Sequence, residues 1–154
     1  MIKRSELDKI VLKESLTHYM PKVSAENAQY EYKKYDIFLC HSSKDIDEIK
    51  KLKQYLKNQG KEAYVCEVDD SHLDPSRANK KTAEILKRRM ENSSELYFVL
   101  SKNSQKSTWM PWELGYFNGK KSDSKIYVYP IIDSNEQEIN GFEGYEYLEL
   151  YPKI

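Results

Sequence analysis

The sequence contains no long apolar run, and this excludes a conventional membrane-spanning helix. Such a helix needs roughly 18 consecutive apolar residues, and no segment of the 154-residue chain approaches that length. The first ten residues, MIKRSELDKI, carry charges throughout, so they do not resemble a secretory signal. We therefore expect a cytoplasmic protein with no membrane partner.

The chain also lacks net charge, because 25 basic residues balance 25 acidic ones. A balanced surface gives no electrostatic reason to expect a nucleic-acid partner. Hydrophobic residues make up 39% of the chain and charged residues 32%, which is typical of a globular protein of one domain.

Several common cofactor motifs are missing. The two cysteines, Cys40 and Cys66, have neither CxxC nor zinc-finger spacing, and the three histidines are scattered. We therefore predict no metal site, and two buried free thiols are favoured over a disulfide. No glycine-rich loop of the Walker or Rossmann kind is present, so no cofactor is expected.

From residue 35 onward, buried strands alternate with amphipathic helices. Near-continuous apolar runs predict strands at 35–42, 63–68, 95–101 and 125–132, and a fifth, edge strand is expected at 147–151. Asp45 with Glu48 is expected to cap the first intervening helix, Gly60 to end it, and Asn79 to cap the next. Alternating strands and helices predict a doubly wound parallel sheet.

The first 34 residues are predicted to form a separate N-terminal helical extension, leaving residues 35–154 as the main domain. Leu7, Ile10, Val11 and Leu16 recur at helical spacing before Pro21, and a second short helix is expected at 24–32. The apolar stripe is narrow, which favours an arm that covers one side of the core over an oligomerisation arm.

The predicted topology brings three loops together, at 42–45, 69–78 and 101–108. In open parallel sheets, ligands bind outside the carboxyl ends of the strands, where these loops begin. The segment STWMPWELGYFNG, residues 107–119, starts a helix directly after the third loop. Trp109 and Glu113 are four residues apart on that helix and point to one side of it.

Glu113 is the candidate catalytic residue, because apolar side chains surround it in the sequence and dry surroundings strengthen charge interactions. The ordinary alternative for a glutamate on a helix is a solvated surface charge. Trp109 offers a flat ring for an aromatic leaving group, and Tyr116 is expected at the rim of the site.

Two pairs of residues are candidates for binding the rest of a substrate. Ser42 and Ser43 either cap the following helix or help its N-terminus to bind phosphate. Asp69 and Asp70 either bind a ribose or form a turn after the second strand. His41 ends the first strand and is interpreted as a hydrogen-bonded structural residue.

The segment YDIFLCHSSKD, residues 35–45, resembles the first box of Toll/interleukin-1 receptor (TIR) domains. The final LS of ELYFVLS and the segment STWMPWELGYF fit the same family. The form PWELGYF, together with the tail GFEGYEYLELYP, is most similar to stand-alone prokaryotic TIR proteins, which include the sensors of Thoeris-type antiphage systems. The resemblance implies a flavodoxin-like three-layer α/β fold with a central parallel five-stranded sheet.

The resemblance also implies an enzyme that takes NAD as its substrate and cleaves the N-glycosidic bond to nicotinamide. The product would be ADP-ribose, or a cyclic or conjugated nucleotide that signals to a downstream effector. Glu113 falls on the family's catalytic glutamate and Trp109 on the aromatic residue that lies against nicotinamide. The loop at 69–78 falls on the segment through which many members self-associate, although it lacks the usual glycine and reads LDPSR.

Two other interpretations remain open from the sequence. The first is a non-catalytic TIR adaptor that assembles through the 69–78 loop, in which Glu113 would be structural. The second is a nucleotide-responsive flavodoxin-like regulator, for which Asp69 and Asp70 are weak candidates as the phospho-acceptor. The sequence disfavours it because the third strand ends in Ser101, where such regulators carry the acceptor aspartate.

Overall fold

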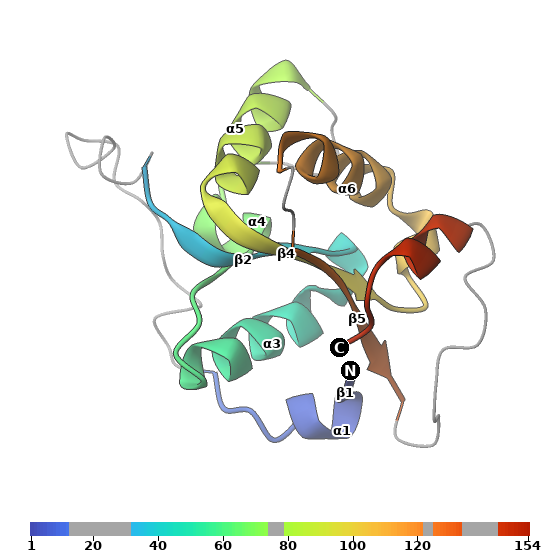
Figure 1. The fold of residues 1–154 in the computed structure, drawn as a ribbon. Coiled ribbons are helices and arrows are strands. Elements are labelled where there is room, and N and C mark those ends of the chain that lie inside the picture. Colours follow the sequence, from blue (N-terminus) through green and yellow to red (C-terminus); the bar gives the residue numbers. More distant parts are fainter. Residues whose placement is uncertain (13–31, 74–78, 122–124, 134–144) are drawn as a thin grey trace.

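A parallel sheet of five strands lies between two layers of helices, as the computed structural model shows (Figure 1). The structure describes residues 1–12, 32–73, 79–121, 125–133 and 145–154. The strands run in the spatial order β1-β5-β4-β2-β3. Their bounds are β1 Ile2–Lys3, β2 Tyr35–Cys40, β3 Ala63–Tyr64, β4 Ser93–Leu100 and β5 Lys125–Ile132. The predicted flavodoxin-like architecture is confirmed.

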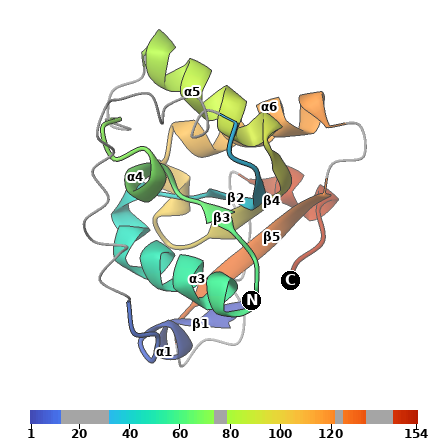
Figure 2. The ribbon, with the colours of Figure 1, turned by 90° about the vertical axis from the view of Figure 1, so that its left-hand side faces the viewer.

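The helices divide between the two faces of the sheet (Figures 1 and 2). One face carries α1 (Arg4–Leu7) and α3 (Ile46–Asn58), and the other carries α5 (Lys80–Glu91) and α6 (Trp109–Lys120). A short helix, α4 (Cys66–Asp69), follows β3, and the described residues also form the 3-10 turns η2 Ser43–Asp45, η3 Ser104–Lys106 and η4 Glu146–Leu150.

Strand β2 shows how the sequence makes two cores. Side chains alternate across a strand, so Phe38 and Cys40 join the core beneath α5 and α6, whereas Ile37 and Leu39 join the core beneath α3. Both faces are buried, which explains the near-continuous apolar run. Cys40, the last residue of the strand, therefore points toward α6.

The fifth strand comes from the N-terminus, so the prediction of a strand at 147–151 is wrong. Ile2 and Lys3 pair with Ile131 and Ile132 on the outer edge of β5. The predicted edge strand is instead η4, in which Leu148 donates its backbone N–H to the carbonyl of Tyr145. Lys153 then forms a parallel bridge with Val128 farther back along β5.

The N-terminal segment is thus part of the sheet where the structure describes it. Helix α1 ends at Leu7, which is fully buried in the core under α3. The rest of the predicted extension lies almost entirely outside the described residues. It includes Leu16, Pro21 and the helix expected at 24–32. The division between 1–34 and 35–154 stays a prediction.

Two further local predictions are wrong. The predicted strand at 63–68 stops at Tyr64, because the Asp69 carboxylate accepts the Val65 N–H at 2.7 Å and the chain turns into α4. Asp45 makes no side-chain cap on α3, since its carboxylate accepts hydrogen bonds from Ser101 and Asn103 instead.

Two predicted helix ends are confirmed. Gly60 adopts a φ of 79°, a left-handed conformation that favours glycine. There the N–H groups of Gly60 and Lys61 donate to the last carbonyls of α3, as in a Schellman motif. Asn79 caps α5 by accepting the Thr82 N–H at 2.9 Å.

Within the described ranges, every helix is too short or too polar to cross a bilayer.

Candidate active site

Helix α6 begins at the carboxyl edge of the sheet and carries Glu113 in its second turn. Ser107 accepts the Met110 N–H at 3.3 Å and helps to start the helix, and Pro111 needs no hydrogen-bond donor in the first turn. Met110, Leu114 and Phe117 anchor the helix in the core. Glu113 lies on this buried side and is only 7% exposed.

The Glu113 carboxyl group contacts the end of β2. The Cys40 thiol is hydrogen-bonded to Glu113 and also lies 3.6 Å from the carbonyl of Met110. Burial raises the pKa of Glu113 to about 7, although the Cys40 hydrogen bond and the nearby charge of His41 act in the opposite direction. A carboxyl group that titrates near neutrality is characteristic of a functional site.

His41 and Glu67 form a pair beside Glu113. His41 Nε2 lies 2.9 Å from Glu67 Oε2, and Nδ1 lies 2.7 Å from the Leu39 carbonyl oxygen. Burial alone would lower the pKa of His41, but Glu67 outweighs it, and the pKa is raised above 6.5. Burial would raise the pKa of Glu67, but the hydrogen bond and charge of His41 lower it to about 2.

The first and third predicted loops meet at this edge. The Ser101 hydroxyl and the Asn103 amide both donate to the buried carboxylate of Asp45, at 2.5 Å and 2.7 Å. Ser42 is buried, and its hydroxyl accepts the Lys44 N–H at 3.4 Å. Ser43 is exposed and hydrogen-bonds Glu67, which links it to the pair beside Glu113.

Three aromatic side chains of α6 form a ladder of partly buried rings that pack against the core. Trp109 is half-buried and meets Trp112 edge-on, with 5.3 Å between ring centroids. Trp112 in turn stacks on Tyr116 at 5.8 Å. The Tyr116 hydroxyl donates to Glu91 on α5 at 2.6 Å. Tyr116 therefore lies at the contact between α5 and α6, and the structure does not bring its hydroxyl to Glu113.

The structure also does not bring the Asp69 and Asp70 carboxylates to Glu113. Asp69 accepts from Lys53 at 2.5 Å, in an ion pair under α3. Asp70 is 1% exposed, accepts the Tyr64 hydroxyl at 2.9 Å and receives two hydrogen bonds from Arg89. Both carboxylates form ion pairs within the fold, so of the two expected roles, ribose binding and turn formation, the contacts favour the turn.

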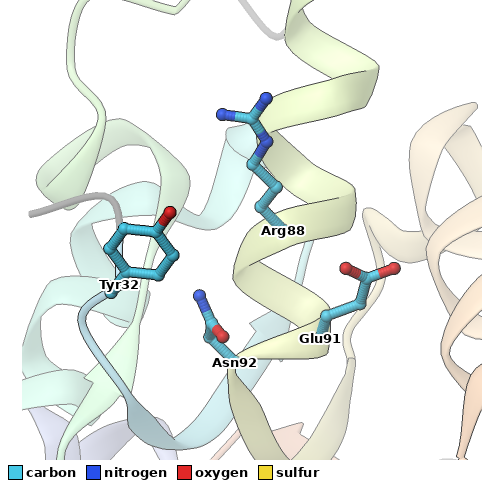
Figure 3. Close-up of a pocket in the computed structure, with 4 residues that line it drawn as sticks. All are labelled: Tyr32, Arg88, Glu91 and Asn92. Carbon is cyan, nitrogen blue, oxygen red and sulfur yellow. The ribbon is translucent and has the colours of Figure 1, made fainter. Parts of the chain in front are cut away.

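A cavity of about 340 Å³ lies away from Glu113, between Tyr32 and the carboxyl end of α5 (Figure 3). Arg88, Glu91 and Asn92 form its other side. The Asn92 carbonyl accepts the N–H of Tyr35, the first residue of β2, whereas Glu113 contacts Cys40, the last. The two places are thus about 16 Å apart along the strand.

Sequence patterns do not reveal that Cys40, His41 and Glu67 act on Glu113. The expectation that His41 is hydrogen-bonded is confirmed, and Glu67 falls within the segment predicted as a strand. The described residues contain no group of three or more His, Cys, Asp or Glu side chains arranged to hold a metal ion.

The fold and this edge of the sheet define a TIR domain. The family model described as "TIR domain" matches residues 37–153, and the chain belongs to that family. The fold is similar to the crystal structure of the TIR domain of the Toll-related receptor TRR-2 from Hydra magnipapillata. That match has a TM-score of 0.51 and 19% identity, and it covers 78% of this chain and 84% of the other.

Two curated relatives are bacterial. A Bacillus cereus (strain MSX-D12) protein named "Probable 3' cyclic ADP-D-ribose synthase ThsB'" is 44% identical over 120 residues, which is 78% of this chain. A Cytobacillus dafuensis protein named "Putative cyclic ADP-D-ribose synthase TIR2" is 30% identical over 122 residues, which is 79% of this chain. The matches span 60% and 31% of those two proteins.

Proposed function

We propose that this protein cleaves the bond between the ribose and the nicotinamide of NAD, with Glu113 as the catalytic residue. The observation that carries the proposal is the buried Glu113 carboxyl group, with its pKa raised to about 7, at the ligand-binding edge of a TIR fold. The names of the two curated relatives, both cyclic ADP-D-ribose synthases, support the same substrate.

The chemistry follows from the charge that the reaction creates. When the glycosidic bond breaks, its electron pair goes to the nicotinamide nitrogen, which leaves as a neutral ring. Positive charge then develops on the ribose, and the Glu113 carboxylate stabilises it in surroundings that hold little water. Departure of a neutral ring requires no general acid, which sets this reaction apart from ordinary glycoside hydrolysis.

Other residues of the site would bind the substrate. Trp109 stands one turn before Glu113 on α6 and is half-buried, so its ring would stack on the nicotinamide. Ser42 and Ser43 lie in the loop that follows His41, where they would contact the ribose and phosphates. The relatives' names favour a cyclic product, formed when a group within the same molecule captures the ribose, over capture by water.

We further propose that the product is a signal to a downstream effector in antiphage defence, and that the protein self-associates through the loop at 69–78. The relative named ThsB' and the resemblance to Thoeris-type sensors support the first point. Residues 74–78 lie outside the described residues, so the second depends on the family resemblance.

The test is to incubate purified protein with NAD, quantify nicotinamide by chromatography and identify the other product by mass spectrometry. The reaction is run over a range of protein concentrations, with and without lysate from phage-infected cells. We expect Glu113→Gln to lower turnover by at least about 100-fold, and Glu84→Gln, an exposed glutamate on α5, to leave it unchanged.

Three results would separate the alternatives. Loss of turnover in a folded Glu113→Gln variant supports the proposal. Full turnover in that variant would remove Glu113 from the mechanism. Absence of wild-type turnover under every condition, while a relative assayed in parallel is active, would favour the non-catalytic adaptor.

A further inference from the structure

We propose that His41, held as an imidazolium by the Leu39 carbonyl and Glu67, is a positioning residue that keeps Glu113 ionised in its buried site. This inference rests on the proposed function, because that reaction requires an ionised Glu113. The charge of the His41 ring can be measured by NMR without any assay of activity.

The hydrogen bonds of His41 determine its protonation state. Both ring nitrogens face acceptors, a backbone carbonyl oxygen at 2.7 Å and a carboxylate oxygen at 2.9 Å. A neutral imidazole has only one N–H, so beside an ionised Glu67 it could donate only one of these bonds. Both bonds form together only when His41 and Glu67 share one more proton. Ser43 also hydrogen-bonds Glu67 and favours its ionised form, which places that proton on His41.

His41 lies close enough to Glu113 for its charge to act on the carboxyl group. His41 directly follows Cys40, whose thiol is hydrogen-bonded to Glu113. The side chain of His41 is 5% exposed and Glu113 is 7% exposed, so little solvent lies between the two charges to screen them. The charge of His41 accordingly lowers the pKa of Glu113 against the effect of burial.

The titratable groups that act on Glu113 come from the end of β2 and from α4. Cys40 is the last residue of β2 and His41 directly follows it, whereas Cys66 and Glu67 belong to α4. Burial raises the pKa values of both thiols, which are therefore neutral near pH 7. Glu67 is negative and favours protonation of Glu113. The positive charge in this group is that of His41, and it offsets Glu67.

The mechanism explains why this balance matters. A protonated Glu113 cannot stabilise positive charge on the ribose. If His41 were neutral, the burial of Glu113 and the negative charge of Glu67 would together favour that inactive form. The pair thus sets the lower pH limit at which Glu113 is a carboxylate.

The first experiment uses the wild-type protein, so no variant has to fold. Nitrogen NMR of ¹⁵N-labelled histidine should show both nitrogens of His41 protonated at about pH 7, with the proton lost at a pH above the ordinary pKa of about 6.5. A neutral ring with a single N–H at that pH would overturn the proposal.

The second experiment compares His41→Gln, His41→Gln/Glu67→Gln and the exposed control His72→Gln. The midpoint of Glu113 is read from the ¹³C shift of its carboxyl group and from the pH dependence of kcat/KM for NAD. We expect His41→Gln to raise the titration midpoint of Glu113 by about one pH unit or more. At pH values below that midpoint, kcat/KM should fall roughly tenfold, whereas well above it the loss should be small.

The double variant separates charge from packing. Because it removes both charges of the pair, its Glu113 midpoint should return toward that of the wild type, while His72→Gln should have no effect. An unchanged midpoint in His41→Gln, or an equal rise in the double variant, would overturn the proposal. If no variant or wild type cleaves NAD, the proposed function fails, and the two NMR measurements still decide the role of His41.

Discussion

Replacing Glu113 with Gln should stabilise the folded protein at alkaline pH. The folded-state pKa of Glu113 is raised from 4.5 to about 7 by burial, so the folded protein holds the Glu113 proton more tightly than the unfolded chain does. As pH rises from about 4.5 through 7, the unfolded chain loses this proton first, and stability falls. Gln does not titrate and avoids this cost.

The magnitude follows from the size of the shift. One pH unit corresponds to about 1.36 kcal/mol, so a rise from 4.5 to about 7 lowers the wild-type free energy of unfolding by about 3 kcal/mol above pH 7. For a chain of this length, that corresponds to roughly 6–12 °C in the unfolding midpoint.

Glu67 provides a matched control with the opposite sign. Its folded-state pKa is lowered to about 2 by His41, so its ionised form stabilises the protein above about pH 4.5, and this contribution is lost as pH falls toward 2. Glu67→Gln should therefore lower the free energy of unfolding by as much as about 3 kcal/mol near neutral pH.

The assay is urea unfolding of the wild type and both variants, followed by circular dichroism at several values between about pH 4.5 and pH 8. The stability of Glu113→Gln relative to the wild type should increase steadily over that range. A variant that is less stable than the wild type at pH 8, or one that differs by the same amount at every pH, would refute the reasoning.

Two further predictions concern the scaffold. Asp70→Asn should lower the free energy of unfolding by about 3–5 kcal/mol, because it removes the negative charge that the buried Arg89 guanidinium contacts through two hydrogen bonds. The control Asp8→Asn breaks an exposed ion pair with Lys51 and should cost about 1 kcal/mol or less; equal urea midpoints for the two variants would contradict this. The thiols of Cys40 and Cys66 are free and buried, so Ellman's reagent should react with neither in the native protein at about pH 8 and with both in concentrated guanidinium chloride. Rapid reaction of the native protein would show that a thiol is accessible.

The parts of the site that the sequence predicts depend on local signals. Trp109 and Glu113 are four positions apart, and helical geometry places both on one side of α6 whatever the rest of the chain does. The convergence of the first and third loops follows from the parallel topology alone, and the contacts of Asp45 with Ser101 and Asn103 confirm it.

Other parts of the site depend on tertiary contacts. Glu67 reaches His41 only because the chain turns into α4 after Tyr64, and a hydrogen bond from Val65 to Asp69 fixes that turn. The apolar run at 63–68 gives no sign of the turn, since it is equally typical of a longer strand. The contact between His41 and Glu67 could not be predicted for the same reason.

The two-residue strand β1 escaped prediction because Ile2 and Lys3 are too short a segment to show any periodicity. They form a strand because they pair with β5, which lies near the opposite end of the chain.

This pairing has a consequence for folding kinetics. The edge of the sheet can close only after nearly the whole chain has been brought together, and the entropy of closing so long a loop opposes the step. We therefore expect β2, β3 and β4 to form the early part of the sheet during refolding, with β1 docking last. Slow acquisition of amide-exchange protection at Ile2 and Lys3 would be the kinetic signature of that order.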